Sequence, residues 1–129
     1  MNFNSILIGS EDPQRLTDYY TRILGEPGFS GGGYTGWMIG SGFVTVGPHS
    51  EVKGRNPEPG RFIWNIETTD VKGDFARFVA AGATVVREPY AFEEQPGSLI
   101  ATFSDPDGNY FQLLSPMDMS MGSEPDKSA

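Results

Sequence analysis

Residues Leu99 to Pro116 read LIATFSDPDGNYFQLLSP, and this segment carries the strongest structural signal in the chain. Its two ends are rich in aromatic and aliphatic residues, which favours strands over Leu99–Phe103 and Tyr110–Leu114. The middle, Asp105–Asn109, holds the residue types of a tight turn, because proline presets one backbone angle and glycine accepts a positive one. The stretch therefore predicts an antiparallel hairpin.

The composition of the 129-residue chain is that of one globular domain. Hydrophobic residues make up 37% of it, which is enough to bury a core in a chain of this length. The 17 glycines and 10 prolines favour many short strands joined by turns over a helical bundle. The absence of cysteine excludes disulfides and thiol chemistry, and it fits a reducing compartment.

The charge of the chain argues against two classes of partner. Nine Lys and Arg against 17 Asp and Glu give a formal net charge of −8. Such a chain repels nucleic acid and anionic membranes, and its basic residues form no cluster that would overcome the repulsion. No apolar run approaches the roughly 18 residues of a membrane span, and Ile6–Ile8 is too short for a signal peptide. We therefore expect a cytoplasmic protein that binds neither nucleic acid nor membrane.

The first half of the chain predicts a strand, a helix and further strands. Phe3–Ile8 is an apolar run suited to a strand, and Asp12 followed by proline begins a helix. The helix has one apolar face, with residues at spacings of three and four; these are Leu16, Tyr19, Tyr20, Ile23 and Leu24. Strands follow over Tyr34–Ile39 and Phe43–Val46, and a polar connector from Pro48 to Gly60 separates the halves.

The second half repeats this order. A strand over Phe62–Glu67 leads into a helix capped by Asp70, and Ala83–Val86 is a further strand. The apolar face of this helix is expected from Val71, Phe75, Phe78, Val79 and Gly82. Residues 88–97 are predicted to form a loop before the closing hairpin. An offset of 58 residues pairs Asp12 with Asp70. The sequence therefore predicts an α+β fold of two βαβββ modules, at about 1–55 and about 60–116.

The last residues differ from the rest in composition. Residues 117–129 are polar and contain three alternating methionines, Met117, Met119 and Met121. We expect them to form a disordered tail, since they have no neighbouring segment to pack against. An alternative is that the methionines lie over a partner's pocket, because methionine adapts to irregular surfaces.

The closing hairpin resembles that of a known superfamily. Asp-Pro-Asp-Gly-Asn, followed by two aromatic residues, a polar residue and two leucines, is similar to the last hairpin of the vicinal oxygen chelate proteins. That superfamily includes glyoxalase I, the extradiol dioxygenases and the bleomycin-resistance proteins. The resemblance covers the chain to about Pro116. It implies one glyoxalase-like domain over residues 1–116, with a mixed sheet that curves around an open cup.

The resemblance also implies where a metal would bind. In the superfamily's metalloenzymes, a histidine at the start of each module's first strand and a glutamate on each last strand hold the ion. Here the histidine positions fall on Ser5 and Ile63, and the closing glutamate is Gln112. The first-module acidic position falls near Val46 or Gly47. These side chains are weak ligands, or none, for Mn, Fe, Ni or Zn. We therefore expect no metal cofactor.

An organic ligand is expected in the cup instead. If Gln112 keeps the direction of the superfamily's glutamate, strand alternation turns the residues two positions away into the cup as well. Trp37 would supply a stacking wall, as would Tyr90 or Phe92 from the loop. The predicted ligand-binding set is Ser5, Leu7, Trp37, His49, Ile63, Asn65, Tyr110, Gln112 and Leu114; no catalytic residue is assigned.

Three functions remain open at this point. The first is a metal-independent protein that binds a small organic molecule. The second is a lyase, isomerase or dioxygenase with a divalent metal at a non-standard site that involves His49 or Glu94. The third is a structural module whose sheet only makes a dimer. Chains with two such modules commonly pair in the superfamily, so we expect a homodimer, and residues 48–60 are long enough for an exchange of modules.

Overall fold

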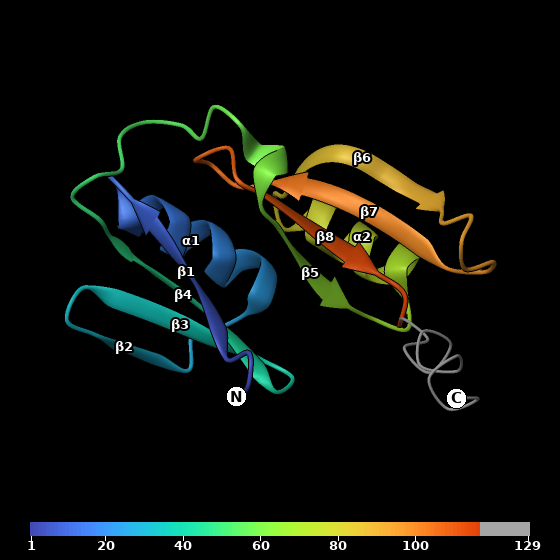
Figure 1. Ribbon diagram of the computed structural model, residues 1–129, viewed down its shortest axis with the longest axis horizontal. Helices are drawn as coiled ribbons and strands as arrows, with labels where there is room; N and C mark the ends of the chain where they lie inside the picture. Colours follow the sequence, from blue (N-terminus) through green and yellow to red (C-terminus); the bar gives the residue numbers. More distant parts are fainter. Residues whose placement is uncertain (117–129) are drawn as a thin grey trace.

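The computed structural model describes residues 1–116 as eight strands, two α-helices and one short 3-10 helix (Figure 1). The first module holds β1 (Ser5–Ser10), α1 (Pro13–Leu24), β2 (Phe29–Gly31), β3 (Tyr34–Ile39) and β4 (Gly42–Pro48). After the 3-10 helix Pro59–Arg61, the second holds β5 (Ile63–Glu67), α2 (Val71–Ala80), β6 (Thr84–Ala91), β7 (Leu99–Ser104) and β8 (Tyr110–Leu114). The predicted disordered tail, with its methionines, lies outside the described residues. Within 1–116, no helix is long and apolar enough to cross a membrane.

Each module forms its own four-stranded mixed sheet. The strand orders are β1-β4-β3-β2 and β5-β8-β7-β6, so the two modules share one topology. In each sheet the first strand pairs in parallel with the last strand of the module, and the remaining pairs are antiparallel. The α+β fold of two βαβββ modules, predicted from the sequence, is therefore confirmed.

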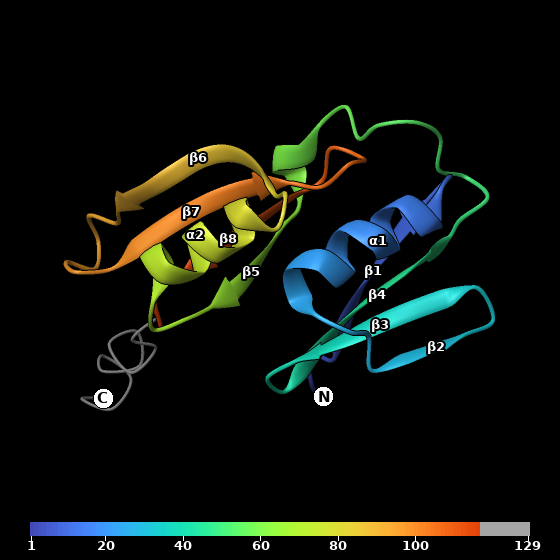
Figure 2. The ribbon, with the colours of Figure 1, turned by 180° about the vertical axis from the view of Figure 1, so that it is seen from behind.

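Each helix covers one face of its own sheet. Both helices lie behind the sheets in Figure 1 and in front of them in the reversed view of Figure 2. Strand alternation leaves a second face uncovered in each module. Open face A carries Ser5, Leu7, Phe29, Tyr34, Met38, Phe43 and Thr45. Open face B carries Ile63, Asn65, Glu67, Ile100, Thr102, Tyr110, Gln112 and Leu114.

One continuous core joins the two modules. The ring of Tyr20, on α1, lies 5.7 Å from the ring of Phe111 and 5.9 Å from that of Trp64, both measured between centroids. Phe111 stacks in turn on Phe103 at 5.4 Å. Tyr20, Phe103 and Phe111 are fully buried. Since the first helix packs on rings of the second module, the two sheets share their apolar interior.

Only one of the two helices is capped by its aspartate side chain. Asp70 Oδ1 accepts a hydrogen bond from the Gly73 N–H at 3.0 Å, as expected at the start of α2. Asp12 stands at the corresponding position of α1 but makes no side-chain cap. Its own N–H donates to the Ser10 hydroxyl at 3.0 Å. The expectation that Val79 lies on the buried face of α2 is wrong, because its side chain is exposed.

Strand β6 is longer than the sequence predicts. The predicted strand ends at Val86, whereas β6 continues to Ala91 through residues assigned to a loop. Its pairing with β7 shifts register twice, between Val85 and Arg87 and again between Arg87 and Tyr90. Such bulges break the strict alternation by which a strand is recognised. The sequence pattern therefore stops at the first irregularity, although the pairing continues.

Candidate functional site

A pocket of about 630 Å³ lies between β1 and β5, and is called here the first pocket. Ser5 and Ile63, the residues at the superfamily's histidine positions, both line it together with Asn65. Its other walls are mostly apolar: Phe3, Ile6, Ile39, Phe43, Val44, Phe62, Trp64 and Ile66. The fold thus brings the two first-strand positions, 58 residues apart in the chain, to one pocket.

A second pocket, of about 200 Å³, lies on open face B. Asn65, Gln112 and Leu114 line it from β5 and β8, while Phe92 and Ile100 close it from the β6–β7 side. Residues Ser98, Leu99, Ser115 and Gln95 complete the lining. Asn65 lines both pockets, so five of the predicted residues form one strip from β1 to β8: Ser5, Ile63, Asn65, Gln112 and Leu114.

The amide of Gln112 is held in place by its neighbour strand. Gln112 lies opposite Asn65 on one side and opposite Thr102 on the other. Its Nε2 donates to Thr102 Oγ1 at 3.0 Å. This bond orients the amide group, so that the Gln112 carbonyl oxygen is left to accept from a ligand. The position that carries a glutamate in the superfamily's metalloenzymes therefore carries an oriented neutral amide here.

Trp37 and His49 lie outside both pockets. Trp37 is buried in the core on the helix side of its sheet, and its Nε1 donates to the Gly25 carbonyl at 2.9 Å. It is therefore no wall of either pocket. His49 is exposed in the connector, where its Nδ1 accepts from the Glu51 N–H at 3.2 Å. Alternation along β3 was the available sequence signal for the face on which Trp37 lies. Its cross-strand partner is the core residue Val44, so that face is the buried one.

Leu7 and Tyr110 lie on the open faces but line neither pocket. Leu7 is exposed on open face A. Tyr110 is half-buried on open face B, opposite Ile63 on one side and Ser104 on the other. Both residues therefore flank the strip of pocket residues without belonging to the described pockets.

Open face A presents large apolar side chains that sequence reasoning missed. Phe29, Tyr34 and Met38 are all exposed there, as is Leu7 on β1. The rings of Phe29 and Tyr34 lie across Gly36 and Gly47, where an added Cβ would overlap them. Alternation along Tyr34–Ile39 was the available signal, because it separates Tyr34 and Met38 from the core residue between them.

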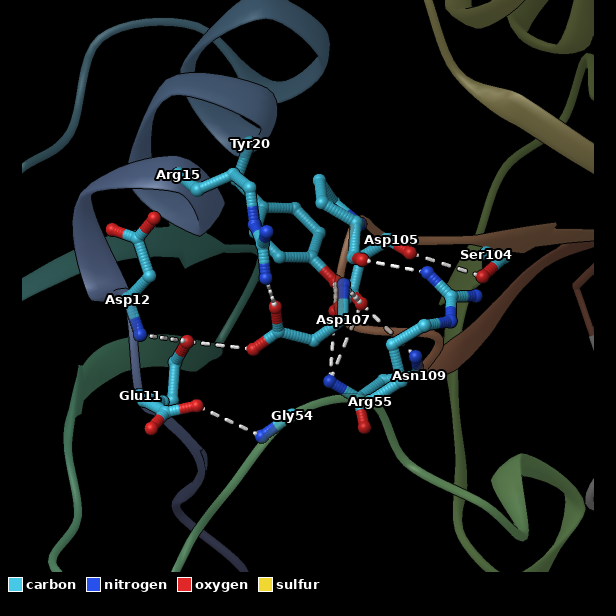
Figure 3. Close-up of polar contacts among 12 residues, drawn as sticks. Glu11, Asp12, Arg15, Tyr20, Gly54, Arg55, Ser104, Asp105, Asp107 and Asn109 are labelled. Carbon is cyan, nitrogen blue, oxygen red and sulfur yellow. Dashed lines mark hydrogen bonds and ion pairs between the residues drawn. The ribbon is translucent and has the colours of Figure 1, made fainter.

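The turn Asp105–Asn109 lies against α1 and the connector (Figure 3). Asp107 accepts a hydrogen bond from the Ser10 hydroxyl at 2.6 Å and pairs with Arg15. Asp105 accepts from the Tyr20 hydroxyl at 2.7 Å. Both carboxyl groups are buried. These acids join the second module's hairpin to the first module's helix, so their role is to hold the modules together.

Burial changes the pKa values of side chains in this contact between the modules. It raises the pKa of Asp105 above its ordinary value, although hydrogen bonds from Tyr20 and Asn109 act in the opposite direction. It also raises the pKa of Tyr20 well above its ordinary value and that of Tyr19 to about 12. Both phenols therefore stay protonated at neutral pH and act as hydrogen-bond donors.

The donors at the superfamily's metal positions do not fit a transition metal. Ser5 offers a hydroxyl, Gln112 an amide, and Ile63 no lone pair. Among residues 1–116, no three His, Cys, Asp or Glu side chains are grouped so that they could hold an ion. His49 and Glu94 lie in loops of different modules.

Known proteins share this fold. A family model described as a glyoxalase-like domain matches residues 5–114. A glyoxalase-related enzyme from Fulvimarina pelagi is 20% identical with a TM-score of 0.70, over 89% of this chain and 88% of that one. A glyoxalase/bleomycin resistance protein from Albidiferax ferrireducens T118 is 18% identical with a TM-score of 0.69, over 89% and 98%. TioX from Micromonospora sp. ML1 is 20% identical with a TM-score of 0.67, over 91% and 100%. No curated protein matches the sequence.

Proposed function

Because the chain belongs to the glyoxalase-like domain family, we propose that it binds a small organic molecule along the strip from Ser5 to Leu114, without a transition metal. The single observation that carries this proposal is the position of Asn65, which lines both pockets. One ligand can therefore contact both the first pocket and the second pocket on open face B.

The size and lining of the pockets support a small-molecule ligand. The first pocket, at about 630 Å³, falls within the roughly 300–1,000 Å³ of ordinary ligand sites. Such sites are mostly apolar and contain a few polar groups that orient the ligand. Here those groups are the Ser5 hydroxyl and the amides of Asn65 and Gln112. The proposed role is binding or sequestration.

The experiment uses a pocket-filling variant and a matched control. Ile63, which is 37% exposed, lines the first pocket; Val79, which is 42% exposed, lies on α2 outside the pockets. Cationic glycopeptide-type compounds and hydrophobic metabolites are screened by thermal shift. We expect Ile63→Trp to abolish the shift of a compound that binds, and Val79→Trp to preserve it. Equal shifts in both variants, or no shift with any compound, would refute the proposal.

Metal content tests the second part of the proposal. Protein purified without chelator is expected to contain less than about one tenth of an equivalent of Mn, Fe, Ni or Zn, because the donor set is weak. The measurement is elemental analysis of the purified protein. A stoichiometric transition metal that is lost in His49→Ala would instead establish a non-standard metal site and reopen the enzymatic function.

We also propose that the chain forms a homodimer. The support is the row of exposed apolar side chains on open face A, since soluble proteins rarely leave such a patch uncovered. Met38 is 60% exposed in this row. Light scattering should give the mass of a dimer for the wild type and for Val79→Glu, and that of a monomer for Met38→Glu. A monomeric wild type would be inconsistent with the proposal.

A further inference from the structure

Arg87 differs from the other arginines of residues 1–116. Arg15, Arg22, Arg55, Arg61 and Arg77 each donate a hydrogen bond to a carboxylate or a backbone carbonyl. The Arg87 guanidinium donates to no acceptor within these residues. Its central carbon lies 3.6 Å from the centroid of the Tyr90 ring. The stack holds the flat guanidinium group in place, while its N–H donors stay available.

The two bulges of β6 place this pair on open face B. Residues three apart in a regular strand point to opposite faces. The register shifts on either side of Arg87 change this, so that Arg87 pairs with Thr102 and Tyr90 with Ile100. Directly opposed residues of antiparallel strands share a face. Ile100 lines the second pocket, and Tyr90 is therefore its neighbour on the next strand.

Arg87 also ends a row of polar side chains across the sheet. In register order, the row runs from Asn65 through Gln112 and Thr102 to Arg87, one residue on each strand. At roughly 4.8 Å between strands, β6 lies about 10 Å from β8. A molecule that meets Gln112 with one end can therefore reach the guanidinium with the other.

Charge on this face is unevenly distributed. Glu67 lies on β5, at the opposite edge from Arg87, and repels an anionic group from that side. The net charge of −8 is spread over the whole chain and is screened beyond a Debye length of about 8 Å. A contact with the guanidinium is not screened in this way. Arg87 is therefore the cationic group on this face that an anion can contact directly.

We propose that the ligand of open face B is a small carboxylic acid, whose carboxylate binds Arg87 while its apolar body fills the second pocket. The planar guanidinium matches a carboxylate through two parallel hydrogen bonds. Phe92, Ile100 and Leu114 supply the apolar contacts, and the Gln112 carbonyl oxygen accepts from a donor on the ligand. This assignment rests on the proposed function and names its ligand class.

The test compares an acid with its uncharged analogue. The probes are 3-phenylpropanoate and 3-phenylpropanamide, and binding is followed by titration of ¹⁵N-labelled protein. We expect shifts at the amides of residues 98–100 and 112–115, and an affinity for the acid at least tenfold higher than for the amide. Arg87→Gln should remove the preference. Lys72→Gln, which deletes an exposed charge on α2, should preserve it.

Each other outcome refutes a defined claim. Equal affinity for acid and amide in the wild type, or an acid preference that survives in Arg87→Gln, refutes the carboxylate assignment and leaves the proposed function standing. If Arg87→Gln and Lys72→Gln lose the preference for the acid equally, the preference comes from general charge attraction, and this outcome also refutes the assignment. If neither probe shifts the pocket amides, the carboxylate assignment fails; the independent pocket-filling screen then decides whether the proposed function fails too.

Discussion

Asp105 lies at the contact between the modules, and its contribution to stability depends on pH. Its Oδ1 accepts from the N–H groups of Asp107 and Asn109, and its Oδ2 accepts from Tyr20 and the Asn109 side chain. Burial raises its pKa in the folded protein above the ordinary 3.8. Between these two values the folded state binds more protons than the unfolded state. The contribution of Asp105 to stability is therefore fully present below 3.8 and falls as the pH rises through the folded pKa.

The variant Asp105→Asn tests this sign. It removes the titrating group and places an NH₂ where the Asn109 amide now donates, which leaves buried donors unpaired at a cost of about 1–3 kcal/mol. We expect the variant's loss of unfolding free energy to be largest below about pH 4 and to shrink as the pH rises. Urea unfolding over a pH series measures it. Tyr20→Phe keeps the carboxyl group and should keep the falling slope; a loss that grows with pH would contradict the assignment.

At the scale of elements, the two helices begin with the same residue type but not with the same bond. Asp70 caps α2 through the Gly73 N–H, whereas the Asp12 side chain makes no cap on α1. The end of β1 explains the difference, because the Ser10 hydroxyl accepts from the Asp12 N–H and donates to Asp107. The repeat in the sequence paired the two aspartates without showing this difference.

Matched alanine variants test the difference between the helix starts. Asp70→Ala should lower the unfolding free energy by about 1 kcal/mol, since it removes a capping hydrogen bond. Asp12→Ala should change it by less than about 0.5 kcal/mol, as expected for an exposed residue without such a bond. Urea denaturation at neutral pH compares them. If Asp12→Ala cost as much as Asp70→Ala, the assignment of the caps would be wrong.

At the scale of the whole molecule, the modules are joined by more than the shared core. Arg77 Nη1 donates to the Ile23 carbonyl at 3.1 Å, and Arg22 Nε donates to the Ala81 carbonyl at 3.3 Å. A carbonyl at the C-terminal end of each helix thus accepts a hydrogen bond from an arginine of the other helix. Cations at helix C-termini are favourable, because the last carbonyls have no partner within the helix.

This joined interior predicts a single unfolding transition for residues 1–116. Trp37 reports on the first module and Trp64 on the second. In Trp64→Phe and in Trp37→Phe, the fluorescence of the remaining tryptophan should therefore change at the same urea concentration as the far-ultraviolet circular dichroism. Phe111→Ala should shift both transitions together to lower urea concentration. It should lower the free energy of unfolding by about 3–5 kcal/mol. Two separated transitions would show that the modules fold independently.

Local sequence signals predict the closing hairpin, the start of each helix and the two-module plan, although they did not indicate β2 (Phe29–Gly31). These depend on signals within a few residues: the turn Asp105–Asn109, the helix start at Asp12-Pro13 and the alternation along strands. The sequence also supplied the residues of the strip, because Ser5 and Ile63 line the first pocket, Gln112 and Leu114 line the second, and Asn65 lines both. What these residues bind stays a prediction.

Which side chains meet depends on contacts between distant parts of the chain. Ser10 and Asp107 are 97 residues apart, and no local pattern records their hydrogen bond. Alternation along β3 separates Trp37 from its sequence neighbours, but the register of β3 against β4 decided that the face of Trp37 is the buried one. Arg87 and Tyr90 reach one face through bulges that the sequence pattern does not reveal. Local propensity acts within an element, whereas burial and register are set by contacts between residues distant in the chain.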